Sequence, residues 1–514
     1  MMQTLSRRNF MKSALAGAAA AILRGGSGVT WAAGERRRPN FVIFLADDLG
    51  YGDLGCYGNP IIRTPNIDRF AGQGVRFTDC HAAGTVCSPS RASLLTGRTP
   101  YRLGFYSILG RGDIHLRREE VTIASLLSNH GYDTCFVGKW HVTNINNPKS
   151  NQPNPGDHGF DHWFATQVNA FGTGPENHDR YIRNGKKVGP VDGWYCDVIV
   201  KEALDWLASR PDQNRPFLLV VCSHEPHTPV RPPEKYAAIY DNADADRLEK
   251  TLDYGKILRT DRDIADNKKY YYGTVTQLDN AFGTLIDGID EMGLKDNSLV
   301  FLTSDNGPET PVSVEESGGQ WNDESRDRCF GTPGPLKGMK RYTYEGGHRV
   351  PGIARWPRHI KPGSQCADLV NGTDLLPTLC ELAGVRPPAD RVIDGSSVVP
   401  LFTGGKVVRV RPQCWIFPTG YYYVPHMAMR EGDYAIVGWF NKKTGAQTHM
   451  EWVKSARLER FELYNLKKDL DESENLSGKE PERLKAMAAR MRKLWREIQA
   501  EGPTWNWNSG RPKS

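Results

Sequence analysis

The sequence predicts an α/β protein with a mostly parallel central sheet flanked by helices, followed by a smaller antiparallel sheet plus helix. Short apolar runs rich in Val, Ile, Leu and Phe alternate with amphipathic segments, which is typical of parallel sheets. Four of these runs end in ionisable residues, and beyond about residue 405 the chain becomes aromatic and strand-like. At 514 residues the chain is too long for one typical core, so two domains are expected.

Strands and helices alternate in the first and larger part. Buried strands are expected at the apolar runs 41–46, 134–137, 216–222 and 298–303. Helices are expected at 64–74, 90–96, 122–131, 194–209 and 270–292. Before the second of these helices, Ser88-Pro89-Ser90 indicates a helix start, because proline is tolerated in a first turn and serine caps free N–H groups.

The last part, residues 406–514, is predicted to be a small α+β subdomain that follows a main domain at 34–405. The aromatic runs 415–417 and 434–437 are its expected strands. Its final helix has one apolar face, formed at three- and four-residue steps by Leu484, Met487, Met491, Leu494 and Ile498. This face is expected to pack against the body of the protein.

Residues 1–33 are predicted to be a signal peptide and no part of the fold. The segment 6–12, Ser-Arg-Arg-Asn-Phe-Met-Lys, resembles the twin-arginine (Tat) export motif, and a small-residue apolar run follows at 14–23. We therefore expect a bacterial protein that the Tat export machinery carries, already folded, to the periplasm or the medium. The rest of the chain has no stretch apolar enough to span a bilayer, so no stable membrane anchor is expected.

Charge and cysteine content exclude some classes of partner. The formal net charge is +6, and removal of the four basic residues of segment 1–33 lowers it to +2, so no nucleic-acid partner is expected. The ten cysteines form no C-x-x-C pair. Folding in the reducing cytosol before export argues against many obligatory disulfides, although one or two bridges remain open.

Polar side chains follow four of the predicted strands. Asp47-Asp48 follows the first strand, Lys139-Trp140-His141 the second, the segment 224–227 the third and Asp305-Asn306 the fourth. The carboxyl ends of parallel strands meet at one edge of a sheet, where such proteins place their chemistry. Buried carboxylates also need a cation or another partner. The sequence therefore predicts a functional site at this edge.

The segment 87–98, Cys-Ser-Pro-Ser-Arg-Ala-Ser-Leu-Leu-Thr-Gly-Arg, resembles the signature of the type I, formylglycine-dependent sulfatases. A free cysteine is usually a buried structural residue, but a match over twelve residues is far more specific. The resemblance implies that a maturase converts Cys87 to Cα-formylglycine, whose hydrate is the nucleophile. We expect Cys87 to lie in a surface pocket.

The resemblance extends over residues 39–476, with further motifs at 39–52, 64–68, 138–141, 226–229, 303–307 and 344–351 in the family's order. Within that family, the sequence resembles bacterial arylsulfatases and N-acetylgalactosamine-6-sulfatase-like enzymes. The resemblance implies the α/β fold of the alkaline-phosphatase-like superfamily, with 34–405 as the catalytic domain. It also implies one divalent cation, usually Ca²⁺ with Mg²⁺ as the alternative, held by Asp47, Asp48, Asp305, Asn306 and the modified Cys87.

The same resemblance implies a set of cationic and proton-transfer residues: Arg91, Lys139, His141, His227 and Lys340. In that family His227 and Lys340 would meet the leaving oxygen, and His141 would take the proton from the sulfated hemiacetal. Lys337 competes with Lys340 for its role. A further sulfate contact is open between Gln167 and Asn169.

The predicted function is a sulfuric ester hydrolase that removes sulfate from a sulfated carbohydrate, a polysaccharide or a glycosaminoglycan fragment. Five aromatic residues are candidates to stack on sugar rings: Trp321, Trp415 and the three tyrosines at 421–423. One alternative is a phosphodiesterase or phosphonate monoester hydrolase of the same superfamily. Another is a non-catalytic carbohydrate-binding relative, which a broken site would indicate.

Overall fold

The computed structural model describes residues 37–110, 113–170, 174–241, 265–309, 328–417 and 426–506. The predicted signal peptide, Trp321 and the tyrosines 421–423 lie outside these described residues. The predicted boundary between the domains at residue 405 stays a prediction. Among the helices of the described residues, none has the length and apolar character needed to cross a membrane.

A ten-stranded sheet lies at the centre, in the order β11-β2-β10-β9-β1-β8-β4-β5-β6-β7. Its strands are β1 (Asn40–Asp47), β2 (Val75–Phe77), β4 (Asp133–Lys139), β5 (His162–Thr166), β6 (Tyr181–Arg183), β7 (Lys186–Gly189), β8 (Phe217–Pro226), β9 (Ser298–Ser304), β10 (Gly352–Arg355) and β11 (Ser364–Cys366). The run from β9 through β1, β8 and β4 to β5 is parallel, while β10, β6 and β7 pair antiparallel. The predicted mostly parallel sheet is therefore confirmed.

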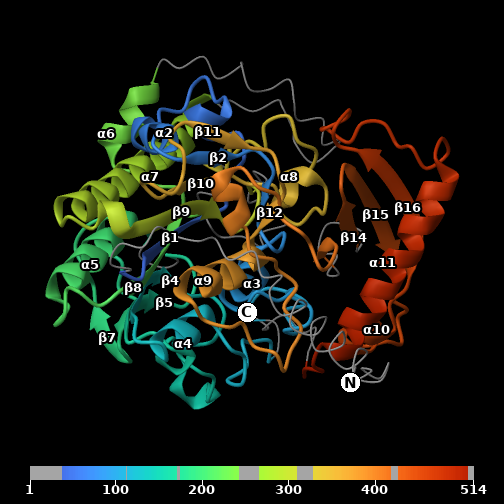
Figure 1. Ribbon diagram of the computed structural model, residues 1–514, viewed down its shortest axis with the longest axis horizontal. Coiled ribbons are helices and arrows are strands. Elements are labelled where there is room, and N and C mark those ends of the chain that lie inside the picture. The colour runs from blue at the N-terminus through green and yellow to red at the C-terminus, as the bar shows by residue number, and fades with distance from the viewer. Residues whose placement is uncertain are drawn as a thin grey trace, which may run out of the picture. The chain divides into compact units, whose positions relative to one another are not determined.

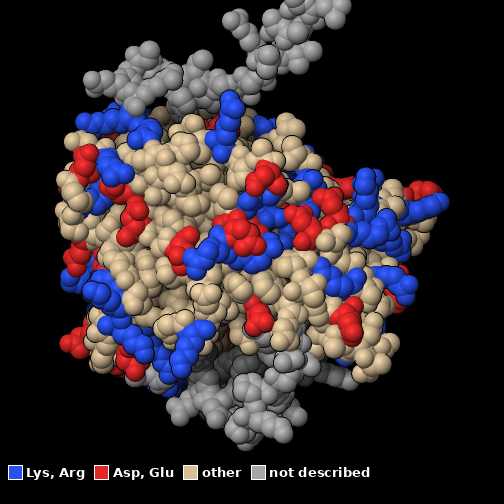
Figure 2. Space-filling model, turned by 90° about the horizontal axis from the view of Figure 1, so that it is seen from below, with Lys and Arg blue, Asp and Glu red and all other residues tan. Residues whose placement is uncertain are grey.

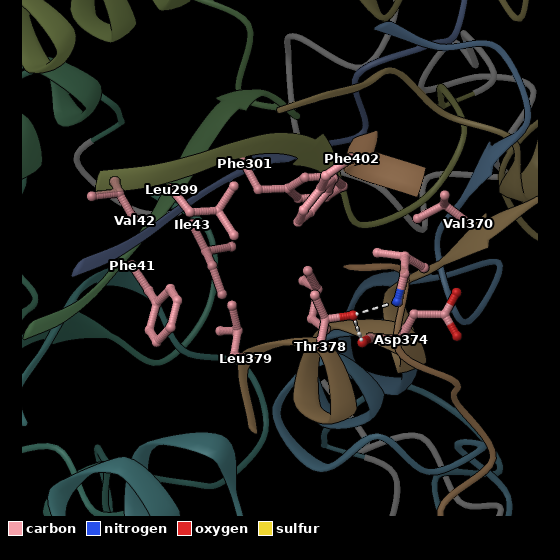
Figure 3. A pocket seen from close by; sticks show the side chains of 12 residues that line it. Phe41, Val42, Ile43, Leu299, Phe301, Val370, Asp374, Thr378, Leu379 and Phe402 are labelled. Carbon is pink, nitrogen blue, oxygen red and sulfur yellow. Dashed lines mark hydrogen bonds between the residues drawn. The ribbon is translucent and has the colours of Figure 1, made fainter. Parts of the chain in front are cut away.

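Helices cover the sheet, as predicted: α2 (Pro65–Gly72), α3 (Cys87–Thr96), α4 (Ile123–Ser128), α5 (Tyr195–Ser209), α6 (Glu234–Ala237), α7 (Ala265–Glu291), α8 (Glu345–His348) and α9 (Leu375–Ala383). Figure 1 shows α5 and α7 side by side next to β8. Val42 and Phe44 of β1 belong to the core that α2, α5 and α7 complete. The alternate side chains Phe41 and Ile43 face a small apolar hollow beside Leu379 of α9 (Figure 3). Strand β1, in the middle of the sheet, is thus buried on both faces.

Helix α3 differs from its prediction at its start. It begins at Cys87, three residues before the expected start at residue 90, and its N-cap is Val86. No side chain caps the helix. Ser90 Oγ donates to the carbonyl oxygen of Val86 at 3.0 Å, and Ser88 Oγ accepts from the N–H of Leu109 at 3.0 Å. The expected serine cap is therefore wrong, because these hydroxyls bind other backbone groups.

The C-terminal part forms a four-stranded antiparallel sheet from β13 (Gln413–Phe417), β14 (His426–Glu431), β15 (Tyr434–Phe440) and β16 (Leu458–Asn465). Helix α10 (His449–Ser455) connects β15 to β16, and α11 (Pro481–Glu501) runs along β15 and β16 (red in Figure 1). Met487, Met491, Leu494 and Ile498 of α11 are buried, whereas Leu484 is only half-buried. The predicted sheet plus helix is confirmed.

Trp415 is a core residue and presents no face to a sugar. Only 1% of it is exposed. Its indole N–H donates to the carbonyl oxygen of Ala82 at 2.7 Å, and its ring stacks on His348 with centroids 3.9 Å apart. The proposed stacking role of Trp415 is therefore wrong. Its ring instead joins the small sheet to β3 (Cys80–His81) and to α8.

A buried ion network joins the same surfaces. Arg430 of β14 lies 3.2 Å from a carboxylate oxygen of Asp79 and 3.2 Å from one of Glu345. Burial alone would raise the pKa of Asp79, but Arg430 and the neighbouring Arg349 hold that pKa well below its usual value. The network remains charged, and removal of one partner would leave an uncompensated buried charge.

No disulfide joins any two of the ten cysteines, all of which lie among the described residues, so the bridges that the sequence left open are absent from the structure. On the face shown in Figure 2, basic and acidic side chains are interspersed among uncharged ones. That mixture agrees with the low net charge calculated without segment 1–33.

Candidate active site

The ten predicted site residues lie at the carboxyl edge of the central sheet or on segments in contact with it. Asp47 ends β1, Lys139 ends β4, and Asp305 directly follows β9. Each of the ten is at most 7% exposed: Asp47, Asp48, Cys87, Arg91, Lys139, His141, His227, Asp305, Asn306 and Lys340. The expected surface pocket at Cys87 is wrong, because every residue of α3 is buried.

Two basic side chains pair with the aspartates at the ends of β1 and β9. Lys139 Nζ contacts Asp47 Oδ2. Arg91 Nε donates to Asp305 Oδ2 at 2.8 Å, and Arg91 Nη2 lies 2.8 Å from the same oxygen in an ion pair. Arg91 Nη1 also donates to the carbonyl oxygen of Lys139 at 2.7 Å. Because buried charges are stable only when they are paired, these contacts hold the four side chains in one arrangement.

Asp48 connects Lys340 to the segment Asp305-Asn306. Its carboxylate accepts from Lys340 Nζ at 2.7 Å and from Asn306 Nδ2 at 2.6 Å. Its backbone N–H donates to Asp305 Oδ1 at 3.3 Å. The backbone of Asp48 has φ 63°, in the left-handed region that aspartate tolerates better than most residues. This turn directs two successive carboxylates into the same site.

The arrangement fits a hard divalent cation. Asp47, Cys87 and Asp305 each offer a ligand atom, and these atoms all lie within 4.8 Å of one another. Asp47 Oδ1 and Asn306 Oδ1 are buried and accept no hydrogen bond from the described residues. Burial, together with the Asp47 charge, raises the pKa of Asp305 to about 7, so the negative charge here is under-compensated. Oxygen donors of this kind are the ligands that Ca²⁺ and Mg²⁺ prefer.

The site lowers the pKa of Asp47 but raises the pKa of Cys87. Burial alone would raise the pKa of Asp47, but nearby cations, Lys139 above all, hold it well below its usual value. Asp47 is therefore ionised. Burial raises the pKa of the Cys87 thiol. Because the thiolate is the reactive form, an unmodified Cys87 would be a poor nucleophile.

Both predicted proton-transfer histidines are neutral in the free site. Burial and nearby cations lower the pKa of His141 and of His227 well below the ordinary value. His227 Nδ1 lies 2.7 Å from the backbone carbonyl oxygen of the next residue, so it carries the ring proton. Its Nε2 lies 3.5 Å from Asp48 Oδ2 and faces the site.

The structure also separates the residue pairs that the sequence left open. Lys340 contacts Asp48, whereas Lys337 Nζ donates to a backbone carbonyl of the C-terminal part at 3.0 Å. The amide nitrogen of Asn169 lies 2.9 Å from His227 Nε2, the ring nitrogen that can accept a hydrogen bond from it. Gln167 Oε1 instead accepts a backbone N–H outside the site at 3.0 Å. Asn169 is thus the candidate that reaches the site.

Glu309 is a site residue that sequence reasoning missed. It is 3% exposed, and its Oε2 lies 3.4 Å from Lys340 Nζ. Burial opposes the charged form of Lys340, but Asp48 and Glu309 raise its pKa above the ordinary value. Lys340 is therefore a fixed cation. The available signal was the position of Glu309, two residues after the Asp-Asn-Gly turn that follows β9.

The architecture indicates the class of protein. A mostly parallel sheet with acidic and basic residues at its carboxyl edge is found in the alkaline-phosphatase-like fold of sulfatases, which this structure matches. Residues 39–385 match the sulfatase family, and residues 338–501 match the C-terminal region of N-sulphoglucosamine sulphohydrolase. The chain belongs to the sulfatase family and is a hydrolase that acts on sulfate esters.

Several known proteins are similar over most of their length. Arylsulfatase A of Homo sapiens is 34% identical over 496 residues, covering 88% of this chain and 86% of that protein. N-acetylgalactosamine-6-sulfatase of Rattus norvegicus is 32% identical over 400 residues, covering 73% of this chain and 68% of that protein. The crystal structure of Ps i-CgsB in complex with k-i-k-neocarrahexaose has a TM-score of 0.71 and 25% identity, covering 92% and 95%. Phosphonate monoester hydrolase of Agrobacterium radiobacter, with a TM-score of 0.60, 19% identity and coverage of 91% and 96%, shares the fold alone.

Proposed function

We propose that this sulfatase removes sulfate from a sulfated carbohydrate, with Cα-formylglycine formed from Cys87 as its nucleophile. The observation that carries the proposal is the position of Cys87, whose sulfur lies within 4.8 Å of ligand oxygens of Asp47 and Asp305. A thiol is a poor nucleophile at this buried position. An aldehyde hydrate would place hydroxyl oxygens there instead. The relative bound to neocarrahexaose supports a carbohydrate as the substrate.

The cation would be Ca²⁺, or Mg²⁺, held by the oxygen ligands Asp47, Asp48, Asp305 and Asn306 and by the modified residue 87. When bound, it supplies positive charge for the sulfate oxygens and polarises the nucleophile. The residues of the chain supply the rest of the positive charge. Arg91 and Lys139 hold the aspartates in place, and Lys340 keeps its ammonium charge beside Asp48.

Proton transfer is assigned to the two histidines. His141 is neutral and buried, which suits a base that accepts a proton at residue 87. His227 presents Nε2 toward Asp48 and would protonate the leaving oxygen. His227 must gain a proton for this role, and the anionic sulfate of the substrate favours that gain. Lys340 would stabilise the same leaving oxygen by its fixed charge.

A substrate panel tests the proposal. The purified, matured enzyme is assayed with sulfated oligosaccharides, an aryl sulfate, a phosphodiester and a phosphonate monoester. We expect hydrolysis of at least one sulfated oligosaccharide, with kcat/KM at least about 100-fold above that for either phosphorus ester. Faster hydrolysis of a phosphorus ester would favour the phosphodiesterase or phosphonate hydrolase alternative. Sugar binding without turnover would favour the non-catalytic alternative, although every expected site position is filled.

We also propose that two partners act before the enzyme reaches its substrate. A formylglycine-generating maturase would modify Cys87, and the Tat machinery would export the folded protein through the signal at 1–33. Replacement of Arg7 and Arg8 by Lys should retain the protein inside the cell, as cell fractionation would reveal. Unchanged export of this variant would contradict the assignment of the signal.

A further inference from the structure

The ammonium group of Lys340 lies between two buried carboxylates. Its Nζ is 2.7 Å from Asp48 Oδ2 and 3.4 Å from Glu309 Oε2. Asp48 has other partners, because it also accepts from Asn306 and lies 3.5 Å from His227 Nε2. Under the proposed function Asp48 must bind the cation as well. Glu309 is then the carboxylate whose contact with Lys340 is independent of the cation.

Glu309 is itself held by an arginine. The two terminal guanidinium nitrogens of Arg341 donate to its carboxylate, with Nη2 at 2.8 Å from Oε2 and Nη1 in contact with Oε1. Such two-point pairs fix orientation as well as distance. The backbone N–H of Lys340 also donates to the carbonyl oxygen of Pro308 at 3.0 Å. The segments 308–309 and 340–341 are thus joined by backbone and side-chain contacts.

The backbone at Arg341 has an unusual conformation. Its φ is 81°, in the left-handed region that residues other than glycine seldom adopt. Such strain persists only where the surroundings impose it, and it concentrates at functional sites. Here the N–H of Arg341 donates to the carbonyl oxygen of Thr85 at 2.9 Å, two residues before Cys87. The strained residue therefore contacts both the segment before Cys87, at Thr85, and the segment after Asp305-Asn306, at Glu309.

We propose that Glu309 and Arg341 are positioning residues, which hold the Lys340 ammonium in register with residue 87 and with the leaving oxygen of the substrate. The inference rests on the proposed function, in which Lys340 meets that oxygen. Arg341 acts through its side chain on Glu309 and through its backbone on the loop before α3. Neither residue needs to touch the substrate for this role.

A purely structural ion pair would behave differently from a positioning pair. Loss of a structural pair changes stability and lowers the rate for all substrates alike. Loss of a positioning pair affects the step that depends on Lys340, which is departure of the leaving group. An aryl sulfate has a good leaving group and needs little help, whereas a sugar hydroxyl is a poor leaving group and needs much.

The test compares kcat on a sulfated sugar with kcat on an aryl sulfate for Glu309→Gln and Arg341→Gly in the full-length, matured enzyme. Gln keeps the shape of Glu309 without its charge. Gly relieves the strained φ, which offsets part of the cost of leaving the Glu309 carboxylate with Lys340 as its remaining cation. We expect both variants to lose about 10- to 100-fold in kcat on the sugar and less than about 3-fold on the aryl sulfate, with KM little changed.

Glu120→Gln is the matched control, because Glu120 is 4% exposed and binds Arg98 and Arg117 at 2.6 and 2.7 Å outside the site. Its ratio of the two rates should equal that of the wild type. Equal losses on both substrates in the Glu309 and Arg341 variants, or no loss, would overturn this inference alone. A wild type that hydrolyses no sulfated sugar would overturn the proposed function, and the inference with it.

Discussion

The substitution Asp305→Asn separates the structural and the catalytic duties of one carboxylate. Asp305 Oδ2 accepts a hydrogen bond from Arg91 Nε and lies 2.8 Å from Arg91 Nη2, and Oδ1 accepts a hydrogen bond from the backbone N–H of Asp48. Asn has the same shape but carries no charge. Its amide can offer one oxygen, so either Arg91 or the backbone of Asp48 loses its acceptor. The proposed cation also loses a negatively charged ligand.

The structure sets the size of the expected effect. Breaking a buried ion pair costs about 3–5 kcal/mol when the remaining charge has no other partner. Arg91 keeps partners, since its Nη1 donates to the Lys139 carbonyl at 2.7 Å and its Nη2 lies 3.6 Å from Asp47 Oδ2. The raised pKa of Asp305 shows that its charge is already disfavoured in the cation-free protein, and the neutral Asn removes this cost. We therefore expect a loss of no more than about 1–2 kcal/mol in the free energy of unfolding of the cation-free protein. Ca²⁺ affinity should fall by at least about 100-fold, and kcat with it.

Urea unfolding followed by circular dichroism measures the first quantity, and calorimetric titration with Ca²⁺ measures the second. Asp279→Asn is the control, because Asp279 is also buried and accepts from the N–H of Ile67 at 2.7 Å, outside the site. It should lose about 1–3 kcal/mol of stability but keep Ca²⁺ affinity and kcat. Unchanged Ca²⁺ affinity and kcat in Asp305→Asn would refute the proposed ligand set.

Four further substitutions test other parts of the account. Cys87→Ala should abolish sulfate ester hydrolysis and cost no more than about 2 kcal/mol of stability in urea unfolding; retained activity would contradict its role. His227→Ala should keep relatively more activity on an aryl sulfate than on a sulfated sugar, and His141→Ala should accumulate sulfated enzyme, visible by mass spectrometry. Equal losses on both substrates, without a trapped adduct, would mean that these roles are wrong. Trp415→Ala should cost about 3–5 kcal/mol and expose the C-terminal sheet to limited proteolysis; unchanged resistance would show that the ring does not join the two sheets.

The centre of the sheet could be predicted because β1, β4, β8 and β9 contain continuous apolar runs and each ends in or is followed by polar residues. The prediction was too short for β8. This strand ends at Pro226, four residues beyond the expected end at residue 222. Apolar periodicity cannot detect that extension, because its side chains are polar and are buried by the site. The register supplies the reason, since Pro226 pairs with Asp47 at the sheet edge.

The aromatic residues were harder to assign from sequence. Trp415 has the chemistry of a sugar platform and equally that of a core residue, and only its contact with the Ala82 carbonyl decides between them. Glu309 was missed for a related reason. Its partner Arg341 lies 32 residues further along the chain, and such a separation leaves no pattern in sequence. Lys340, by contrast, could be placed from its spacing to the Glu-Gly-Gly-His segment of α8.

The central claim is that residue 87 acts as an aldehyde, and mass spectrometry of the peptide that contains it tests this most directly. The protein is produced with and without a formylglycine-generating maturase, and each preparation is assayed on a sulfated sugar. We predict the mass loss of thiol-to-aldehyde conversion, with activity proportional to the converted fraction. Full activity in a preparation whose Cys87 is entirely unmodified thiol would contradict the claim.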